Sequence, residues 1–293
     1  MKIGIVGLGS IGKRHAINAT KLGHDVHIYD PVVKGDFRFR YERDLYDWCD
    51  AAVIASPSQF HEPGLRACVE RGKHALVEKP ISVAIGALPE LLRVAADKKL
   101  VVMVGNNLRM HLCVQEAKMW LDAEYIGIPL WASFTCAQLS KKYSEDGVVL
   151  NTGSHEVDLA LHLFGPARIA SAYVNPLMAD FVLEHASGVR SVFHCDFVTA
   201  IEVRRFRIVG AGGDIFCDLP SRALRRRMVD DKLPTVVHEN GFVAIGSYDT
   251  DYLDEMRAFI DRIEGKDVPG ATGADGLATL DVLIEVEKKA GLE

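Results

Sequence analysis

The chain has 293 residues, 48% hydrophobic and 25% charged, which is enough for about two globular domains with their own cores. Its formal net charge of −6 gives no overall positive field, which argues against nucleic acid and anionic membranes as partners. No apolar run approaches the ~18–20 residues of a membrane span, and a predicted strand starting at residue 2 leaves no room for a signal or transit peptide. With six scattered cysteines and no CxxC spacing, the expected location is the reducing cytoplasm.

The first part of the chain alternates short apolar runs with helix-like stretches. The predicted strands are residues 3–6, 26–29, 52–55, 75–77 and 101–104, and the predicted helices are 12–22, 43–48, 63–71 and 83–98. Continuous apolar strands alternating with helices are typical of a parallel sheet covered on both faces. We therefore predict a doubly wound Rossmann domain over residues 1–118.

A glycine motif follows the first predicted strand and opens the first predicted helix. Gly7-x-Gly9-x-x-Gly12 lets the backbone turn tightly and approach a pyrophosphate, which the positive end of the helix attracts. Asp30 follows the second strand, near the position where a carboxylate bonds the ribose hydroxyls of NAD and repels the 2′-phosphate of NADP. NAD is therefore predicted over NADP, although Lys34 is close enough in the chain to reach a phosphate. The predicted dinucleotide contacts here are Gly7, Gly9, Ser10, Ile11, Gly12 and Asp30.

Polar turns follow the next three predicted strands, at the edge of the sheet where ligands of doubly wound folds bind. They are SPSQFH at 56–61, EKP at 78–80 and NNLR at 106–109. Each of them alone is also compatible with a simple turn or a surface lysine. The predicted cofactor contacts are Ser56, Pro57, His61, Glu78 and Lys79, and the predicted substrate contacts are Asn107 and Arg109.

The pattern changes after a predicted helix over residues 111–121. Longer, partly alternating strands are predicted at 130–139, 168–174, 189–198, 202–209 and 213–217, and helices return at 252–263 and 273–289. Alternation indicates a largely antiparallel sheet with unlike faces. Residues 119–293 are therefore predicted to form an α/β domain with a large, mostly antiparallel open sheet.

A local basic run stands out in this acidic chain. Arg225-Arg226-Arg227 has Arg222 close by. A solvated basic edge is the expected interpretation, and a site for a substrate phosphate is the alternative.

The segment with the most titratable residues of catalytic type is a helix predicted over residues 154–164, with Ser154 as its N-cap. Three titratable residues share one face of this helix, namely His155, Asp158 and His162. They are costly to bury without a role. A metal site is one interpretation, but Leu159 stands where the second histidine of HExxH is required. Acid–base catalysis needs only one imidazole, and a satisfied structural cluster remains a third interpretation.

Together these motifs resemble the glucose–fructose oxidoreductase / inositol dehydrogenase / rhizopine-catabolism (Gfo/Idh/MocA) family. The matching segments are GLGSIGKRH at 7–15, SPSQFH at 56–61, EKP at 78–80, NLR at 107–109 and GSHEVDLALHLFG at 153–165. Their order and spacing cover most of the chain. The resemblance implies a nicotinamide cofactor on the first domain and a substrate between this domain and the open sheet of the second.

The resemblance also implies roles for single residues. Lys79 corresponds to the lysine of the EKP motif, and Asp158 and His162 to the pair in the family's HExDxxxH segment, which makes these three the predicted catalytic residues with no metal. The implied substrate contacts on the second domain are Tyr143, Asn151 and His155. Two departures leave the substrate open: Asn151 stands where many members carry Asp, and the loop 140–147 is short.

The predicted activity is NAD-dependent hydride transfer at a carbinol or ketone carbon of a sugar, cyclitol or nucleotide sugar. Two alternatives remain: a sugar hydrolase or epimerase that oxidises its substrate transiently and retains NAD, and a non-catalytic dinucleotide sensor. A homodimer or homotetramer is expected through the exposed face of the second sheet, because the apolar Trp131 and Phe193 are expected to lie on that face.

Overall fold

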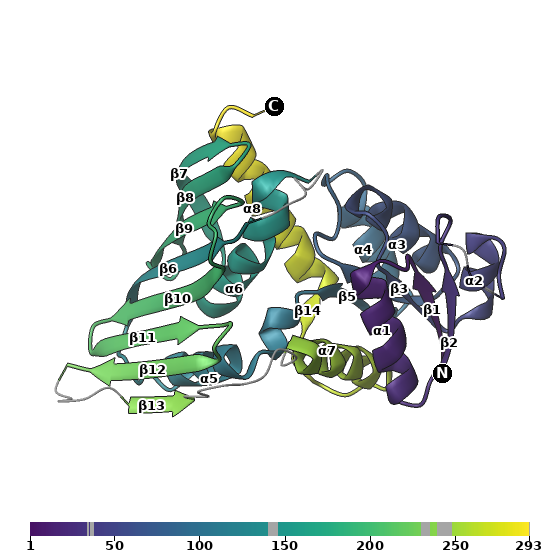
Figure 1. The fold of residues 1–293 in the computed structure, drawn as a ribbon, viewed down its shortest axis with the longest axis horizontal. Helices are drawn as coiled ribbons and strands as arrows, with labels where there is room; N and C mark the ends of the chain where they lie inside the picture. The colour runs from purple at the N-terminus through teal and green to yellow at the C-terminus, as the bar shows by residue number, and fades with distance from the viewer. Residues whose placement is uncertain (34, 36–37, 140–145, 230–234, 239–247, 293) are drawn as a thin grey trace. The chain divides into compact units, whose positions relative to one another are not determined.

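The computed structural model describes residues 1–33, 35, 38–139, 146–229, 235–238 and 248–292 (Figure 1). The chain forms two compact units, and each is described by itself. Unit 1 contains residues 1–110 and 246–280, and unit 2 contains residues 111–245 and 281–293. Within the described residues, no helix is both long and apolar enough to cross a membrane.

Unit 1 is built on a six-stranded sheet with the order β14-β5-β4-β3-β1-β2. Five of the strands run parallel, namely β1 (Lys2–Val6), β2 (Asp25–Tyr29), β3 (Ala51–Ile54), β4 (His74–Glu78) and β5 (Val102–Gly105). The short β14 (Ala271–Thr272) pairs antiparallel with β5. Strands β1, β3 and β4 are buried over most of their length, as expected for a parallel sheet covered on both faces. The predicted Rossmann sheet is confirmed.

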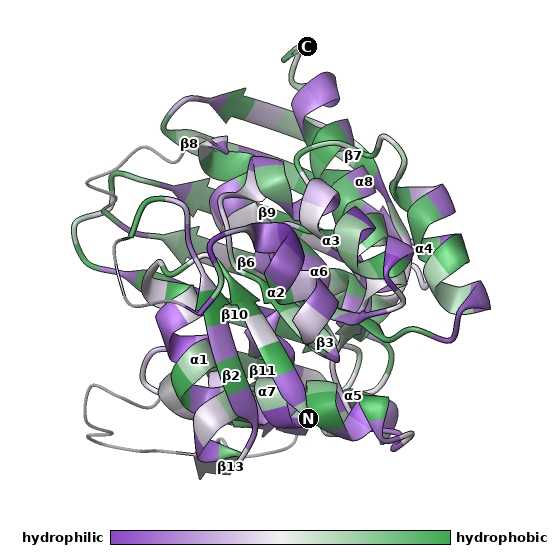
Figure 2. Cartoon of the chain, turned by 90° about the vertical axis from the view of Figure 1, so that its right-hand side faces the viewer, coloured by the Kyte–Doolittle hydropathy of each residue, from purple (hydrophilic) through white to green (hydrophobic). Residues whose placement is uncertain are grey.

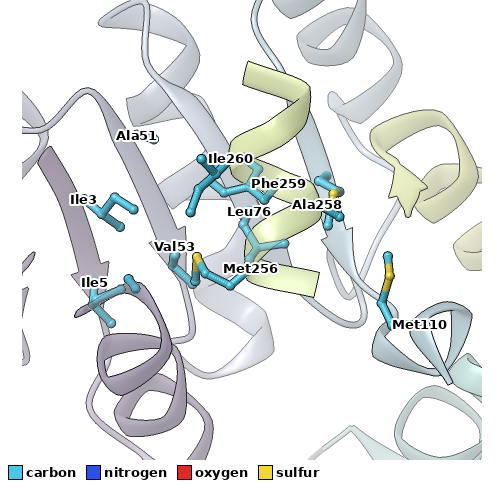
Figure 3. Packing of buried hydrophobic residues seen from close by; sticks show 12 residues of the cluster. Ile3, Ile5, Ala51, Val53, Leu76, Met110, Met256, Ala258, Phe259 and Ile260 are labelled. Atoms are coloured by element: carbon cyan, nitrogen blue, oxygen red, sulfur yellow. The ribbon is translucent and has the colours of Figure 1, made fainter. Parts of the chain in front are cut away.

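Two sets of helices pack on this sheet. Helix α1 (Ser10–Lys21) contacts α7 (Tyr248–Ile263), while α3 (His61–Glu70) contacts both α2 (Glu42–Trp48) and α4 (Leu88–Asp97). Alternate residues of β1 face different sets, because successive side chains of a strand point to opposite faces. Ile3 and Ile5 belong to a core with Met256 and Phe259 of α7 (Figure 3), whereas Gly4 lies against Leu45 of α2.

Helix α4 is shorter than the helix predicted over residues 83–98. It begins at Leu88, because Gly86 has a φ of +41°, outside the helical range, and Pro89 lies in the first turn, where proline is tolerated. From there the helix buries Leu91 on one side and exposes charged residues on the other, so that apolar and polar residues share α4 (Figure 2).

Unit 2 is built on an eight-stranded sheet with the order β13-β12-β11-β10-β6-β9-β8-β7. Its strands are β6 (Pro129–Ala137), β7 (Ala167–Asn175), β8 (Met178–His185), β9 (Arg190–Asp196), β10 (Val203–Gly210), β11 (Gly213–Asp218), β12 (Ala223–Met228) and β13 (Thr235–His238). Strands β6 and β9 run parallel, and the other neighbours pair antiparallel. The predicted, mostly antiparallel sheet is confirmed. Strands β8, β12 and β13 were not predicted, and the arginine-rich β12 lacks the apolar alternation that would have indicated it.

One face of this sheet carries the helices α5 (Leu112–Asp122) and α6 (Ser154–Phe164) (Figure 1). The core of this face contains stacked aromatic rings: Phe193 lies 5.1 Å from Phe134 and 4.5 Å from Phe181, centroid to centroid. Phe193 is 3% exposed, so its assignment to the exposed face was wrong. Successive side chains of β9 point to opposite faces of the sheet, so the neighbours Val192 and His194 point away from this core.

Helix α8 (Gly273–Lys289) begins with a reciprocal cap. The amide N–H of Asp275 donates to Thr272 Oγ1, and the Asp275 carboxylate accepts from the N–H and hydroxyl of Thr272.

The two units alternate along the chain, whereas the predicted division at residue 118 treats them as consecutive. The difference arises because β14 joins the first sheet and α7 packs on it, although both follow the second sheet in the chain.

Candidate active site

A pocket of about 740 Å³ lies in unit 1 at the carboxyl ends of β1, β2 and β3. Of the predicted cofactor contacts, Gly7, Gly9, Asp30, Ser56 and Pro57 line this pocket. Ser10, Ile11 and Gly12 form the first turn of α1, and no side chain caps this helix. Its N-terminal N–H groups therefore suit an anionic group such as a pyrophosphate.

The three glycines of the motif have different tasks. A Cβ on Gly7 would come within 2.5 Å of the Ala55 carbonyl oxygen, and one on Gly12 within 2.0 Å of the Gly7 carbonyl oxygen. These two positions require glycine because backbone packs directly on backbone. A Cβ on Gly9 would meet nothing within 4 Å. This glycine therefore leaves open space in which a ligand can approach the protein backbone.

Asp30 is held in place by backbone donors. Its carboxylate accepts hydrogen bonds from the N–H groups of Leu8 at 2.6 Å, Val32 at 2.8 Å and Val33 at 2.7 Å. Burial alone would raise the pKa of Asp30, but these three N–H groups lower it below its usual range. The group stays ionised at neutral pH, and its carboxylate has room for one more donor such as a ribose hydroxyl.

Ser56 supplies a polar atom that needs a partner. It lines the pocket, and its buried Oγ has no hydrogen-bond partner within the part of the chain that the structure describes. Such a group fits the polar rim of a bound nucleotide. The sequence did not identify Phe60, which is 52% exposed and also lines the pocket. The SPSQFH turn placed it nearby, but a turn motif alone does not say which side chain faces a ligand.

The predicted cofactor contacts His61, Glu78 and Lys79 are not among the residues that line this pocket. Lys79 follows β4 and is partly exposed. The buried Glu78 is bonded to His15, and the buried His61 contacts the carbonyl oxygens of Ser56 and Pro80.

The predicted substrate contacts of unit 1 lie in a buried turn of 3₁₀ helix, Asn107–Met110. Arg109 is 6% exposed, and its guanidinium lies 3.4 Å from the Asp275 carboxylate. Burial raises the pKa of Asp275, but the Thr272 donors and the Arg109 charge outweigh this effect and lower it. Arg109 is therefore engaged in holding the start of α8.

Helix α6 presents the titratable residues of unit 2. A turn of π-helix, Val149–Gly153, runs directly into it, so Ser154 is already helical and is not the predicted N-cap. Asn151 lies in this turn and is partly exposed. Asp158 is 1% and His155 8% exposed, and the more accessible His162 lies in the last turn. The predicted residue Tyr143 lies outside the described residues, as does Lys34.

A partly buried ion pair connects α6 to the sheet. Arg204 of β10 donates from Nε to Glu156 Oε1 at 2.8 Å and from Nη2 to Oε2 at 3.3 Å. Glu156 is two residues from Asp158 and therefore projects from a different side of the helix. The two-pronged contact limits rotation of α6 about its axis and so helps to set where Asp158 points.

The basic run Arg225-Arg226-Arg227 does not form one continuous edge. All three arginines line a surface pocket of about 480 Å³ with Trp131 and Phe216, and Arg225 and Arg227 are exposed there. The guanidinium of Arg226 instead lies 5.1 Å from the ring of Trp120 and 4.5 Å from that of Tyr125. The split follows from strand geometry, since neighbouring residues of β12 face opposite sides.

Comparisons with known proteins were consistent across both units. A family model described as an oxidoreductase family with an NAD-binding Rossmann fold (GFO_IDH_MocA) matches residues 1–106, and the GFO/IDH/MocA C-terminal domain model matches residues 114–216. The inositol 2-dehydrogenase of Burkholderia lata is 25% identical over 340 residues, covering 100% of this chain and 96% of that protein.

Two solved structures show the same fold over nearly the whole chain. The UDP-N-acetylglucosamine 3-dehydrogenase GnnA of Acidithiobacillus ferrooxidans has a TM-score of 0.85 at 19% identity, covering 100% of this chain and 98% of its own. A levoglucosan dehydrogenase in complex with NADH and levoglucosan has a TM-score of 0.85 at 19% identity, covering 99% and 97%.

Proposed function

Because this chain belongs to the Gfo/Idh/MocA family of NAD-binding oxidoreductases, we propose that it transfers a hydride between nicotinamide and a carbinol or ketone carbon. The substrate class we propose is a sugar, a cyclitol or a nucleotide sugar, in line with the names of its relatives. The observation that carries the proposal is the pocket at the glycine motif. It combines open space at Gly9, the fixed carboxylate of Asp30 and the Ser56 Oγ, which has no partner among the described residues.

The residues of this pocket fit a dinucleotide. Asp30 would bond the adenosine ribose, and the first turn of α1 would face the pyrophosphate. Ser56 would donate a hydrogen bond to another part of the cofactor. When bound, NAD supplies the hydride acceptor of the reaction. Unit 1 is thereby assigned to cofactor binding, and unit 2 to substrate binding and oligomerisation.

Three residues are proposed to act on the reacting oxygen. His162 would accept the proton of the substrate hydroxyl during oxidation and return it during reduction. Lys79, as a cation, would stabilise the negative charge that develops on this oxygen. Asp158 would orient the hydroxyl or the imidazole. Asn107, Arg109, Tyr143, Asn151 and His155 remain proposed substrate contacts, and Ser10, Ile11, Gly12, His61 and Glu78 remain proposed cofactor contacts.

A substrate survey tests this function. The purified protein would be incubated with NAD and a panel of polyhydroxylated sugars, cyclitols and nucleotide sugars, with NADH absorbance as the readout and mass spectrometry of co-purifying molecules. Net NADH formation supports the proposal. Hydrolysis or epimerisation with NAD retained would replace it with the transient-oxidation alternative, and NAD binding without any reaction would indicate a sensor.

We expect NAD to bind more tightly than NADP. The Asp30 carboxylate is fixed by three N–H groups and cannot swing away from a 2′-phosphate without losing them. Fluorescence titration of the protein with both cofactors measures the difference. An Asp30→Asn variant should narrow it by removing the repelling charge, and tighter binding of NADP by the unaltered protein would contradict the assignment.

We also propose a homodimer or homotetramer assembled through the face of the second sheet opposite α5 and α6. This face carries Trp131 and Phe216 beside Arg225 and Arg227, and Tyr173 is 59% exposed. Sedimentation equilibrium of the protein and of a Trp131→Glu variant should show an assembly that the added charge weakens. A mass of one chain at micromolar concentration would refute the proposal.

Since all six cysteines are buried free thiols, a reducing cytoplasmic location is proposed as well.

A further inference from the structure

We infer that His15 and His61 are positioning residues for Lys79. Two buried imidazoles, 0% and 1% exposed, hold the residues immediately before and after this lysine. The catalytic meaning of the inference rests on the role proposed for Lys79, whereas the geometry stands without it. The whole arrangement lies within unit 1.

His15 secures the residue before Lys79. Its ring Nε2 lies 2.7 Å from Glu78 Oε1, a hydrogen bond from α1 to the last residue of β4. The other carboxylate oxygen of Glu78 accepts from the Lys79 amide at 3.3 Å. The imidazole, the carboxylate and the lysine backbone thus form one chain of hydrogen bonds.

Gly105 makes space for this arrangement. Glu78 pairs with Gly105 in the parallel register of β4 and β5, and a Cβ on Gly105 would come within 2.9 Å of the Glu78 carboxyl carbon. Glu78 therefore folds over a neighbour that has no side chain. A methyl group there would push the carboxylate away from its present position.

The cluster around His15 is better explained by hydrogen bonding than by a metal. His15, Glu78 and Glu255 of α7 each place one potential ligand atom within 4.8 Å of the others. Two ligands of one zinc ion with bonds of about 2.0–2.1 Å stand about 3.3 Å apart in a tetrahedron. The 2.7 Å between His15 and Glu78 is shorter than this and matches a hydrogen bond to a carboxylate.

His61 secures the residue after Lys79. Its Nδ1 lies 2.7 Å from the Pro80 carbonyl oxygen, and its Nε2 lies 2.8 Å from the Ser56 carbonyl oxygen. The ring therefore links the turn after β4 to the turn after β3. Ser56 lines the cofactor pocket, so His61 connects the position of Lys79 to the wall of this pocket.

Both contacts act where the sheet no longer restrains the chain. Glu78 is the last paired residue of β4, and Lys79 follows it with a long, flexible side chain. A misplacement of about 1 Å at a reacting group can reduce a rate by ~10²-fold. We therefore expect His15→Gln and His61→Gln each to lower kcat by about 10- to 100-fold. The NAD affinity of His15→Gln should stay within about 3-fold of that of the unaltered protein.

A measurement on Lys79 itself separates positioning from general stability. The lysines of the whole protein would be dimethylated with ¹³C-formaldehyde, and the Lys79 signal assigned by its loss in a Lys79→Arg variant. The chemical shift and titration of that signal should change in His15→Gln, His61→Gln and Gly105→Ala. The matched control is His74→Gln at the other end of β4, where His74 Nδ1 accepts from the Val101 amide at 2.9 Å.

The outcomes decide the inference even if one variant does not fold. His61→Gln and Gly105→Ala perturb opposite sides of Lys79 without altering His15, so either can substitute for it. An unchanged Lys79 signal and an unchanged kcat in the folded variants would overturn the inference. A shifted signal in a protein that oxidises no substrate would leave the positioning intact and instead refute the proposed function.

Discussion

Replacing Lys79 with methionine is expected to lower kcat by about 10²–10³-fold, the usual effect of removing one group that stabilises developing negative charge. NAD affinity should stay within a few-fold, because Lys79 is not among the residues that line the dinucleotide pocket. The methionine retains most of the aliphatic length and removes the charge. Steady-state kinetics on the substrate found in the survey, together with NAD titration, measure the two effects separately.

The matched control for this variant is Lys21→Met, which removes an exposed lysine at the end of α1. Its kcat and NAD affinity should equal those of the unaltered protein. If Lys79→Met keeps near-normal turnover, the charge of Lys79 does not act on the reacting oxygen. If it loses NAD affinity in parallel with turnover, the lysine serves cofactor binding rather than the chemical step.

Replacing His162 with asparagine is expected to lower the rate by roughly 10²–10⁴-fold, the usual contribution of a positioned acid–base group. The pH–rate profile should also lose a limb near neutrality, since an imidazole ordinarily titrates at about pH 6.5 and neither a lysine nor an aspartate ordinarily does. The oxidation rate of the unaltered enzyme should fall as pH drops through this limb, because a protonated imidazole cannot accept the hydroxyl proton.

Two further measurements test whether His162 acts on a proton. Free imidazole in the assay should restore part of the activity of a His162→Ala variant, since it can occupy the vacated space and carry the proton. The double variant of Lys79 and His162 should lose less than the product of the two single effects if both act in one event. Full additivity, or a normal pH profile in His162→Asn, would mean that α6 only shapes the site.

Much of unit 1 was predictable because its signals are local. A glycine motif between a strand and a helix fixes the positions of Gly7 and Gly12 by direct backbone contact, and these contacts are present. The position of Asp30 was predictable for a similar reason, because this residue directly follows its strand. The partners of Glu78 were not predictable, because His15 is 63 residues away along the chain. No local pattern states that two such segments meet.

The errors in unit 2 have physical causes. Phe193 was placed on the wrong face because a strand has a period of two, and one residue of register reverses every side chain. Ser154 is not the N-cap, although serine favours that position, because the π-helical turn Val149–Gly153 precedes it and Ser154 is already helical. Arg226 was expected on a solvated edge, whereas it is partly buried with its guanidinium against the rings of Trp120 and Tyr125.

The late position of α7 and β14 in the chain affects how the protein is made. The five parallel strands of the first sheet end at Gly105, but the core that includes Ile3 and Ile5 also contains Met256 and Phe259. At about 5–20 residues per second, translation needs roughly 8–30 seconds to pass from residue 110 to residue 259. Throughout this interval an apolar face of the nascent Rossmann sheet has α1 but lacks α7, while the strands of the second sheet are synthesised. The earliest part to be synthesised is thus among the last whose core can be completed, because that core contains residues of α7.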